Sequence, residues 1–376
     1  MRVLTSLALS LLATLGLGRT AAAKSWCAYP LFVHEWGVHV FDASGRSQDG
    51  RAELLPSWFL GPESVRPRGA GGAVRDLPRD SGERDLPVVH FYSPHAPRMA
   101  ELKVPVSIPV ALEVGFAEGA ATRWFPAVDA LKPADGGAPQ LVWERLDLVV
   151  NATTTPKKTD LPWILEARAL PSLWVQGRSA AERFVFYEGK TREAVPLALA
   201  RAPDWTATTR RYALTNRGRF AIHDIHVVHR EPQASFLVRV ARLDPGQSTT
   251  FSLDDQRVAD VRREGLKSLR AALIDPKVLA APTQYDWSQD RCVMQRDPAV
   301  PFAKADGHTL YAAEADLVLG VWGERFFGGP AGTNIIYRED TAALDALMPL
   351  AVYTDMLNFV VLHRAGLAVW SGVALP

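Results

Sequence analysis

The chain has 376 residues, of which 48% are apolar and 27 are prolines, a composition typical of a globular protein with many loops. Its 42 basic and 41 acidic residues almost cancel and are interspersed, so the charge pattern gives no reason to expect nucleic acid or an anionic membrane as a partner. The length suffices for two or three domains with a sizeable core.

The N-terminus has the order of a secretory signal peptide. Arg2 supplies a short positive start, residues 3–17 are almost wholly apolar, and residues 20–23 end in small side chains that a signal peptidase recognises. The apolar run is too short for a membrane-spanning helix. We therefore expect cleavage after Ala23 and a mature chain exported to the periplasm, the cell surface or the medium. An uncleaved N-terminal anchor is the alternative.

Cys27 and Cys292 are the two cysteines of the chain. In an oxidising compartment such a pair usually forms a bridge. We predict a Cys27–Cys292 disulfide, whose loop-closure entropy would contribute up to about 5 kcal/mol. Two unpaired buried thiols are the alternative.

Most of the chain reads as short strands separated by turns. Residues 31–41 are rich in β-branched and aromatic side chains and predict a strand bent at Gly37. Residues 61–85 are rich in Gly, Pro and Arg and predict a flexible loop. Residues 102–114 alternate cleanly, and Pro109 places that strand at a sheet edge because proline cannot donate a ladder hydrogen bond. Further strands are expected at 86–92, 122–126, 141–150, 184–187, 195–200, 210–215, 220–229, 235–240 and 249–253.

The last third of the chain has a mixed pattern. Residues 258–273 carry an apolar stripe at helical spacing, with Asp254 and Asp255 as the expected N-caps. A second helix is expected at 309–326. Strands are expected at 334–337, 357–363 and 367–370.

These patterns predict a mainly β protein, built from sandwich-like antiparallel β domains with a mixed α/β C-terminal region. We divide the chain into four segments: a signal peptide at 1–23, an N-terminal β-rich domain at 24–155, a second β-rich domain at 156–256, and a mixed α and β region at 257–376.

One candidate metal site lies in the first predicted strand. His34, Glu35 and His39 resemble a zinc-protease motif, but that motif needs its histidines four residues apart on a helix, and here they are five apart. On a strand this spacing puts the histidines on opposite faces, and Glu35 shares a face with His39. The structural alternative is a strand whose polar side chains anchor a buried N-terminal segment.

A second candidate lies in residues 223–229, which hold three histidines. Strand alternation would place Asp224 and His226 on one face and His223 on the other. The Asp224 carboxylate could then orient the His226 imidazole for metal binding or proton transfer. A solvent-facing polar stripe is the structural alternative. No serine-hydrolase elbow or phosphate-binding loop is present in the sequence.

The chain resembles a group of secreted proteins of uncharacterised function from myxobacteria and planctomycetes. The resemblance is carried by the signal peptide, by His34-Glu35-Trp36-Gly37, and by the Phe91-Tyr92 pair about 50 residues later. It departs from the group at residues 38–40 and at His90. The resemblance implies export and a shared fold, and the group supplies no catalytic residues to carry over.

Two functions are compatible with the sequence. The leading one is a non-catalytic periplasmic or cell-surface protein that binds or scaffolds, with a cell-envelope protein or a carbohydrate as its partner. The alternative is a metal-dependent hydrolase or oxidoreductase. It would use His34 or His39 with His223, Asp224 and His226, a transition metal such as zinc, and Glu35 as general base. The eleven tryptophans are compatible both with a β core and with an exposed carbohydrate-binding platform, so they do not distinguish the two functions.

Overall fold

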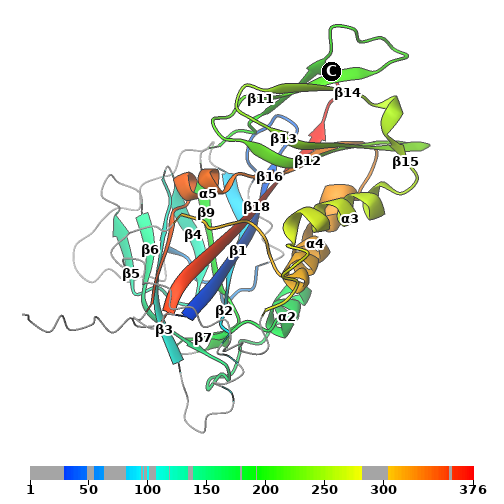
Figure 1. Cartoon of the computed structure of the whole chain (residues 1–376). Helices are drawn as coiled ribbons and strands as arrows, with labels where there is room; N and C mark the ends of the chain where they lie inside the picture. Colours follow the sequence, from blue (N-terminus) through cyan, green and yellow to red (C-terminus); the bar gives the residue numbers. More distant parts are fainter. Residues whose placement is uncertain are drawn as a thin grey trace, which may run out of the picture.

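The structure, a computed structural model of the whole chain, describes residues 29–48, 55–62, 82–94, 96, 100, 107–117, 119–133, 139–177, 180–191, 193–281, 304–354 and 358–376. It is mainly β with several sheets, as predicted (Figure 1). Within these ranges no helix has the length and apolarity needed to cross a membrane. The predicted signal peptide, both cysteines and most of the predicted loop at 61–85 lie outside the described residues.

A nine-stranded sheet forms the centre of the described structure. Its strands lie in the order β15, β13, β12, β16, β18, β1, β2, β9, β4. Their bounds are β1 Tyr29–Phe41, β2 Gly82–Tyr92, β4 Ala120–Phe125, β9 Val185–Thr191, β12 Ile222–Glu231, β13 Ala234–Leu243, β15 Arg257–Val258, β16 Gly332–Glu339 and β18 Asn358–Val373. The β1–β18 pair is parallel and the other neighbouring pairs are antiparallel.

Two smaller sheets cover one face of the central sheet. The six-stranded sheet contains β3 Ser107–Gly115, β5 Ala130–Pro133, β6 Pro139–Val149, β7 Trp174–Gln176, β8 Ala181–Glu182 and β17 Leu350–Thr354. The three-stranded sheet contains β10 Leu197–Arg201, β11 Arg211–Asn216 and β14 Ser248–Ser252. Alternation along β1 explains the arrangement. Leu31 and Val33 enter the core against the six-stranded sheet, and Phe41, on the same face, enters the core against the three-stranded sheet.

Helices cover the opposite face. Helices α2 Pro162–Ala169, α3 Val261–Leu273 and α4 Ala312–Phe327 lie side by side there (Figure 1). Trp36, Val38 and Val40 of β1 pack with α4 residues such as Trp322 in a third core. The short helix α5 Thr341–Leu347 follows β16, and a 3-10 turn spans Asp254–Gln256.

All three predicted segments of the mature chain supply strands to the central sheet. Segment 24–155 gives β1, β2 and β4, segment 156–256 gives β9, β12 and β13, and segment 257–376 gives β15, β16 and β18. The sheet is therefore continuous across the predicted boundaries at 155 and 256. Pairings between strands that lie far apart in the sequence produce this continuity, and the local pattern does not encode them.

Three local predictions were wrong. Strand β3 is not at an edge, because it pairs with β17 on one side and with β6 on the other. The pairing with β17 ends opposite Val110, so Pro109 lies just beyond the paired residues. The N-cap of α3 is Asp260, whose side chain accepts a hydrogen bond from the Arg263 amide. The strands expected at 357–363 and 367–370 are one strand, β18.

The irregularity near Gly37, where the sequence predicts a bend, is a bulge in the neighbouring strand β2. Strand β1 pairs with β18 in unbroken register through Gly37. The register between β1 and β2 shifts between Trp36 and Val38. Over this stretch β1 advances by two residues, whereas β2 advances by three, from Val88 to Asp85. The extra residue lies beside Pro87, and a bulge is where a strand accommodates proline.

Candidate functional site

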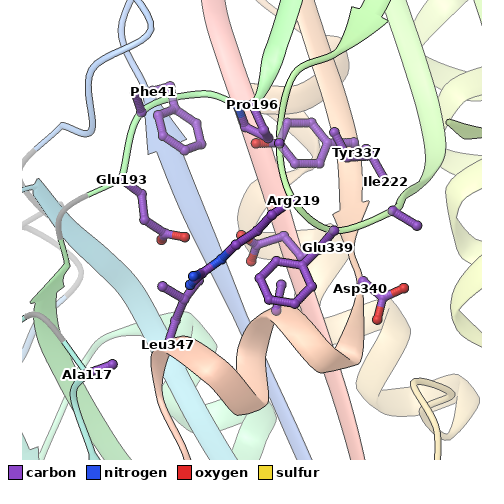
Figure 2. A pocket seen from close by; sticks show the side chains of 15 residues that line it. Phe41, Ala117, Glu193, Pro196, Arg219, Ile222, Tyr337, Glu339, Asp340 and Leu347 are labelled. Atoms are coloured by element: carbon purple, nitrogen blue, oxygen red, sulfur yellow. The ribbon is translucent and has the colours of Figure 1, made fainter. Parts of the chain in front are cut away.

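A pocket opens between the loop that joins β9 to β10, the loop that joins β11 to β12, the end of β16 and helix α5. Its volume is about 330 Å³. Figure 2 shows the Arg219 side chain extending across it, with Glu193 on one side and Glu339 and Asp340 on the other. Apolar side chains make up much of the remaining wall: Phe41, Pro196, Phe220, Ile222, Tyr337, Ala343 and Leu347. The pocket thus combines apolar walls with charges of both signs.

His39 and two glutamates meet at one corner of this pocket. His39 comes from β1, Glu193 from the loop after β9, and Glu339 ends β16; Glu193 and Glu339 line the pocket. One ligand atom from each of the three residues lies within 4.8 Å of the other two. His39 Nδ1 is 3.5 Å from Glu193 Oε2, and its Nε2 is 2.5 Å from Ser47 Oγ. An imidazole with two carboxylates is a donor set that divalent transition metals accept.

Glu35 shares the face of His39, as the alternation predicts, but its carboxylate is engaged elsewhere. Arg364 donates to both Glu35 oxygens, and Tyr187 donates its hydroxyl to Oε1 at 2.5 Å. Arg364 also donates to Asp345 Oδ1 at 3.0 Å. Burial alone would lower the pKa of Arg364, but Glu35 and Tyr187 raise it above its usual value, so the cation stays charged.

His34 lies on the opposite face, toward helix α4. Its Nδ1 is 2.7 Å from Glu314 Oε2, and its ring stacks on His363 with centroids 5.2 Å apart. His34 pairs in register with both His363 of β18 and His90 of β2, so three histidines form one row across three strands. Burial opposes ionisation of Glu314, but the neighbouring His34 holds the pKa of Glu314 below its ordinary value.

The second predicted cluster does not converge on one site. His223 Nε2 is 2.9 Å from Asp340 Oδ2 at the edge of the pocket. The Asp224 carboxylate accepts from Arg338 at 2.8 Å. His226 Nδ1 donates to the backbone carbonyl of Asp224 at 2.7 Å, and its Nε2 is 2.9 Å from Ser268 Oγ of α3. A register shift between residues 223 and 226, with Asp224 at φ 50°, breaks the expected alternation.

Of the predicted site residues, His39 therefore reaches the pocket corner and His223 contacts its rim through Asp340. His34 and His226 face the helices. Sequence reasoning missed Glu193, Glu339 and Arg219, which come from separate segments. No local spacing could have joined them, because the fold alone brings them to His39.

No protein-family model and no curated protein matches this chain. Among solved structures, the chain is similar to the Fcho1 mu homology domain of Danio rerio with bound Eps15 peptide. The alignment covers 93% of this chain and 97% of that chain, at 7% sequence identity and a TM-score of 0.31. Similarity at this level carries no conclusion about ligand, partner or activity.

Proposed function

We propose that this chain is an exported, non-catalytic binding protein whose ligand is a small organic anion with an apolar body, held in the pocket of Figure 2. The observation that carries the proposal is the Arg219 side chain, which extends into a pocket with apolar walls between Glu193 on one side and Glu339 and Asp340 on the other. Such concave sites with few polar groups are the usual form of small-molecule sites. Export follows from the predicted signal peptide at residues 1–23.

Arg219 supplies the recognition. Its guanidinium carbon lies 5.0 Å from the centroid of the Phe220 ring, and it forms no ion pair with any residue in the described ranges. A stacked guanidinium presents two parallel N–H donors, which match the two oxygens of a carboxylate or a phosphate. Phe41, Phe220 and Leu347 provide apolar surface for the remainder of such a ligand.

The histidines and carboxylates support binding over catalysis. Glu35, predicted as a general base, is engaged by Arg364 and Tyr187. His34 and His226 contact elements on the helical face of the sheet, away from the pocket. A catalytic site needs its groups gathered around one reacting atom.

The test is calorimetric titration of the mature chain with benzoate and with the neutral analogue benzamide. We expect saturable benzoate binding that benzamide lacks. Arg219→Gln should weaken it at least about tenfold, because a charge-assisted pair contributes about 1.5–3 kcal/mol. Arg217→Gln is the matched control, since Arg217 is exposed but does not line the pocket. Ala117→Trp should block the pocket from its exposed rim. Equal benzoate affinity in the Arg219 and Arg217 variants would reject the proposal.

A metal-dependent hydrolase or oxidoreductase is the second candidate, favoured by the convergence of His39, Glu193 and Glu339. The enzyme and the binding protein can be distinguished by one measurement. The enzyme requires turnover of a bound ligand that depends on added metal and is lost in Glu339→Gln, whereas the binding function requires saturable binding without turnover.

A further inference from the structure

We infer that His39, Glu193 and Glu339 bind one divalent transition metal ion in the wall of the pocket. The metal site is argued from these three residues alone. Its role as a second anchor for the anionic ligand rests on the proposed function.

The geometry is close to that of a metal site. The 3.5 Å between His39 Nδ1 and Glu193 Oε2 matches the edge of about 3.4 Å in a tetrahedron with bonds of about 2.1 Å. No pair of the three ligand atoms exceeds 4.8 Å, so the remaining separations have to close by about 1.4 Å at most. A carboxylate can cover that distance by rotating, and Glu193, on a loop, has the freedom to do so.

The donor set selects the class of metal. Calcium and magnesium favour oxygen ligands alone, whereas one imidazole with two carboxylates suits zinc, manganese or ferrous iron. The buried His39 ring is held in place, because its Nε2 contacts Ser47 Oγ and a backbone bridge ties Phe41 to Ser47. When Nε2 donates its proton to Ser47, Nδ1 presents a lone pair to the corner, which is the tautomer a metal requires.

Three protein ligands leave a fourth position of a tetrahedral site open. Glu193 and Glu339 line the pocket, so that position faces the pocket interior. The two carboxylates balance a divalent ion, and Arg219 offsets the third pocket carboxylate, Asp340, which also contacts His223 at 2.9 Å. An anion placed between the metal and Arg219 would satisfy both, which is the ligand class proposed above.

The competing explanation is a metal-free ion cluster, with a protonated His39 between the two glutamates. Elemental analysis and calorimetry of the full mature chain, stripped with EDTA and titrated with Zn²⁺ or Mn²⁺, separate the two. We expect one equivalent of metal. The Glu193→Gln/Glu339→Gln double variant should bind it at least about 100-fold more weakly, and Ser47→Ala about tenfold more weakly.

Glu144→Gln, at an exposed position away from the pocket, is the isosteric control and should bind metal as the wild type does. Far-UV circular dichroism verifies that each variant is folded. Metal affinity that is equal in the wild type and the double variant, or no stoichiometric uptake by the wild type, would overturn the metal site. Benzoate binding through Arg219 would survive that result, whereas loss of benzoate binding with intact metal uptake would reject the proposed function alone.

Discussion

Arg364 lies opposite Glu35 in the parallel pairing of β1 with β18, and the two buried side chains form an ion pair with two hydrogen bonds. Tyr187 and Asp345 complete the cluster between the central sheet and the elements that cover it. This pair joins strands more than 300 residues apart, in the one parallel pair of named strands in the described sheets.

Glu35→Gln should strongly destabilise the protein. The substitution leaves Arg364 as a buried cation whose one remaining acidic partner among the described residues is Asp345, and breaking a buried pair in this way costs about 3–5 kcal/mol. Chemical denaturation should show this decrease in the free energy of unfolding, with Glu144→Gln as the neutral control. A decrease below about 1 kcal/mol would mean that water already screens the pair.

Acid should destabilise the fold through its buried histidines. Burial lowers the pKa of His90, His226 and His363, and it lowers the pKa of His308 to about 4. The unfolded chain takes up these protons near pH 6.5, while the folded chain resists until lower pH. The unfolded state therefore binds more protons between about pH 6.5 and 4, and the free energy of unfolding falls as the pH drops through this window.

His308→Gln should make this pH dependence shallower, because it removes a histidine whose pKa burial lowers to about 4. Denaturation curves recorded from pH 7 to pH 4 measure the slope for both proteins. Identical slopes would show that His308 titrates normally in the folded chain.

Two glycines of helix α4 should respond differently to alanine. A Cβ at exposed Gly320 would meet only Glu166 Oε2 at 3.7 Å, so Gly320→Ala should stabilise the protein by up to about 1 kcal/mol. A Cβ at buried Gly323 would lie 2.8 Å from Leu266 Cδ2, so overpacking should cancel or reverse the gain. Thermal melts of the two variants compare them directly. A larger gain for Gly323→Ala would contradict the described packing of α3 on α4.

The Cys27–Cys292 bridge stays a prediction, since both residues lie outside the described ranges. Intact-mass measurement of protein from an oxidising compartment should give a mass lower by two hydrogens than that of the reduced chain. Reaction of both thiols with a maleimide without prior reduction would exclude the bridge.

The elements that follow a strong period were predictable from sequence. The alternation in residues 102–114 predicted β3, which spans Ser107–Gly115 with Ile108, Val110, Leu112 and Val114 buried. The apolar stripe in residues 258–273 predicted α3, which spans Val261–Leu273. The neighbours of a strand were not predictable. Pro109 predicts an edge strand, because proline cannot donate a ladder hydrogen bond. The proline needs only one neighbouring strand to be absent beside it, and the pairing with β17 ends at that point.

The sequence predicts two strands where the structure has one, β18, and Arg364 lies between the two predicted ranges. An arginine followed by Ala365 and Gly366 resembles a turn, but the fold places its charge against Glu35 and keeps the strand continuous. For the same reason, His39 could be nominated from its own segment while Glu193 and Glu339 could not. Their relation to His39 exists only after β1, β16 and the loop after β9 have assembled.

The most direct measurement is anomalous X-ray diffraction at the zinc absorption edge, from crystals of the mature protein grown with zinc chloride and benzoate. We expect a single strong anomalous peak about 2.0–2.2 Å from His39 Nδ1 and from an oxygen of each of Glu193 and Glu339, with benzoate between the peak and Arg219. Zinc bound only at surface residues, with His39 held between the two glutamates and the pocket filled by water, would contradict both the metal site and the proposed ligand class.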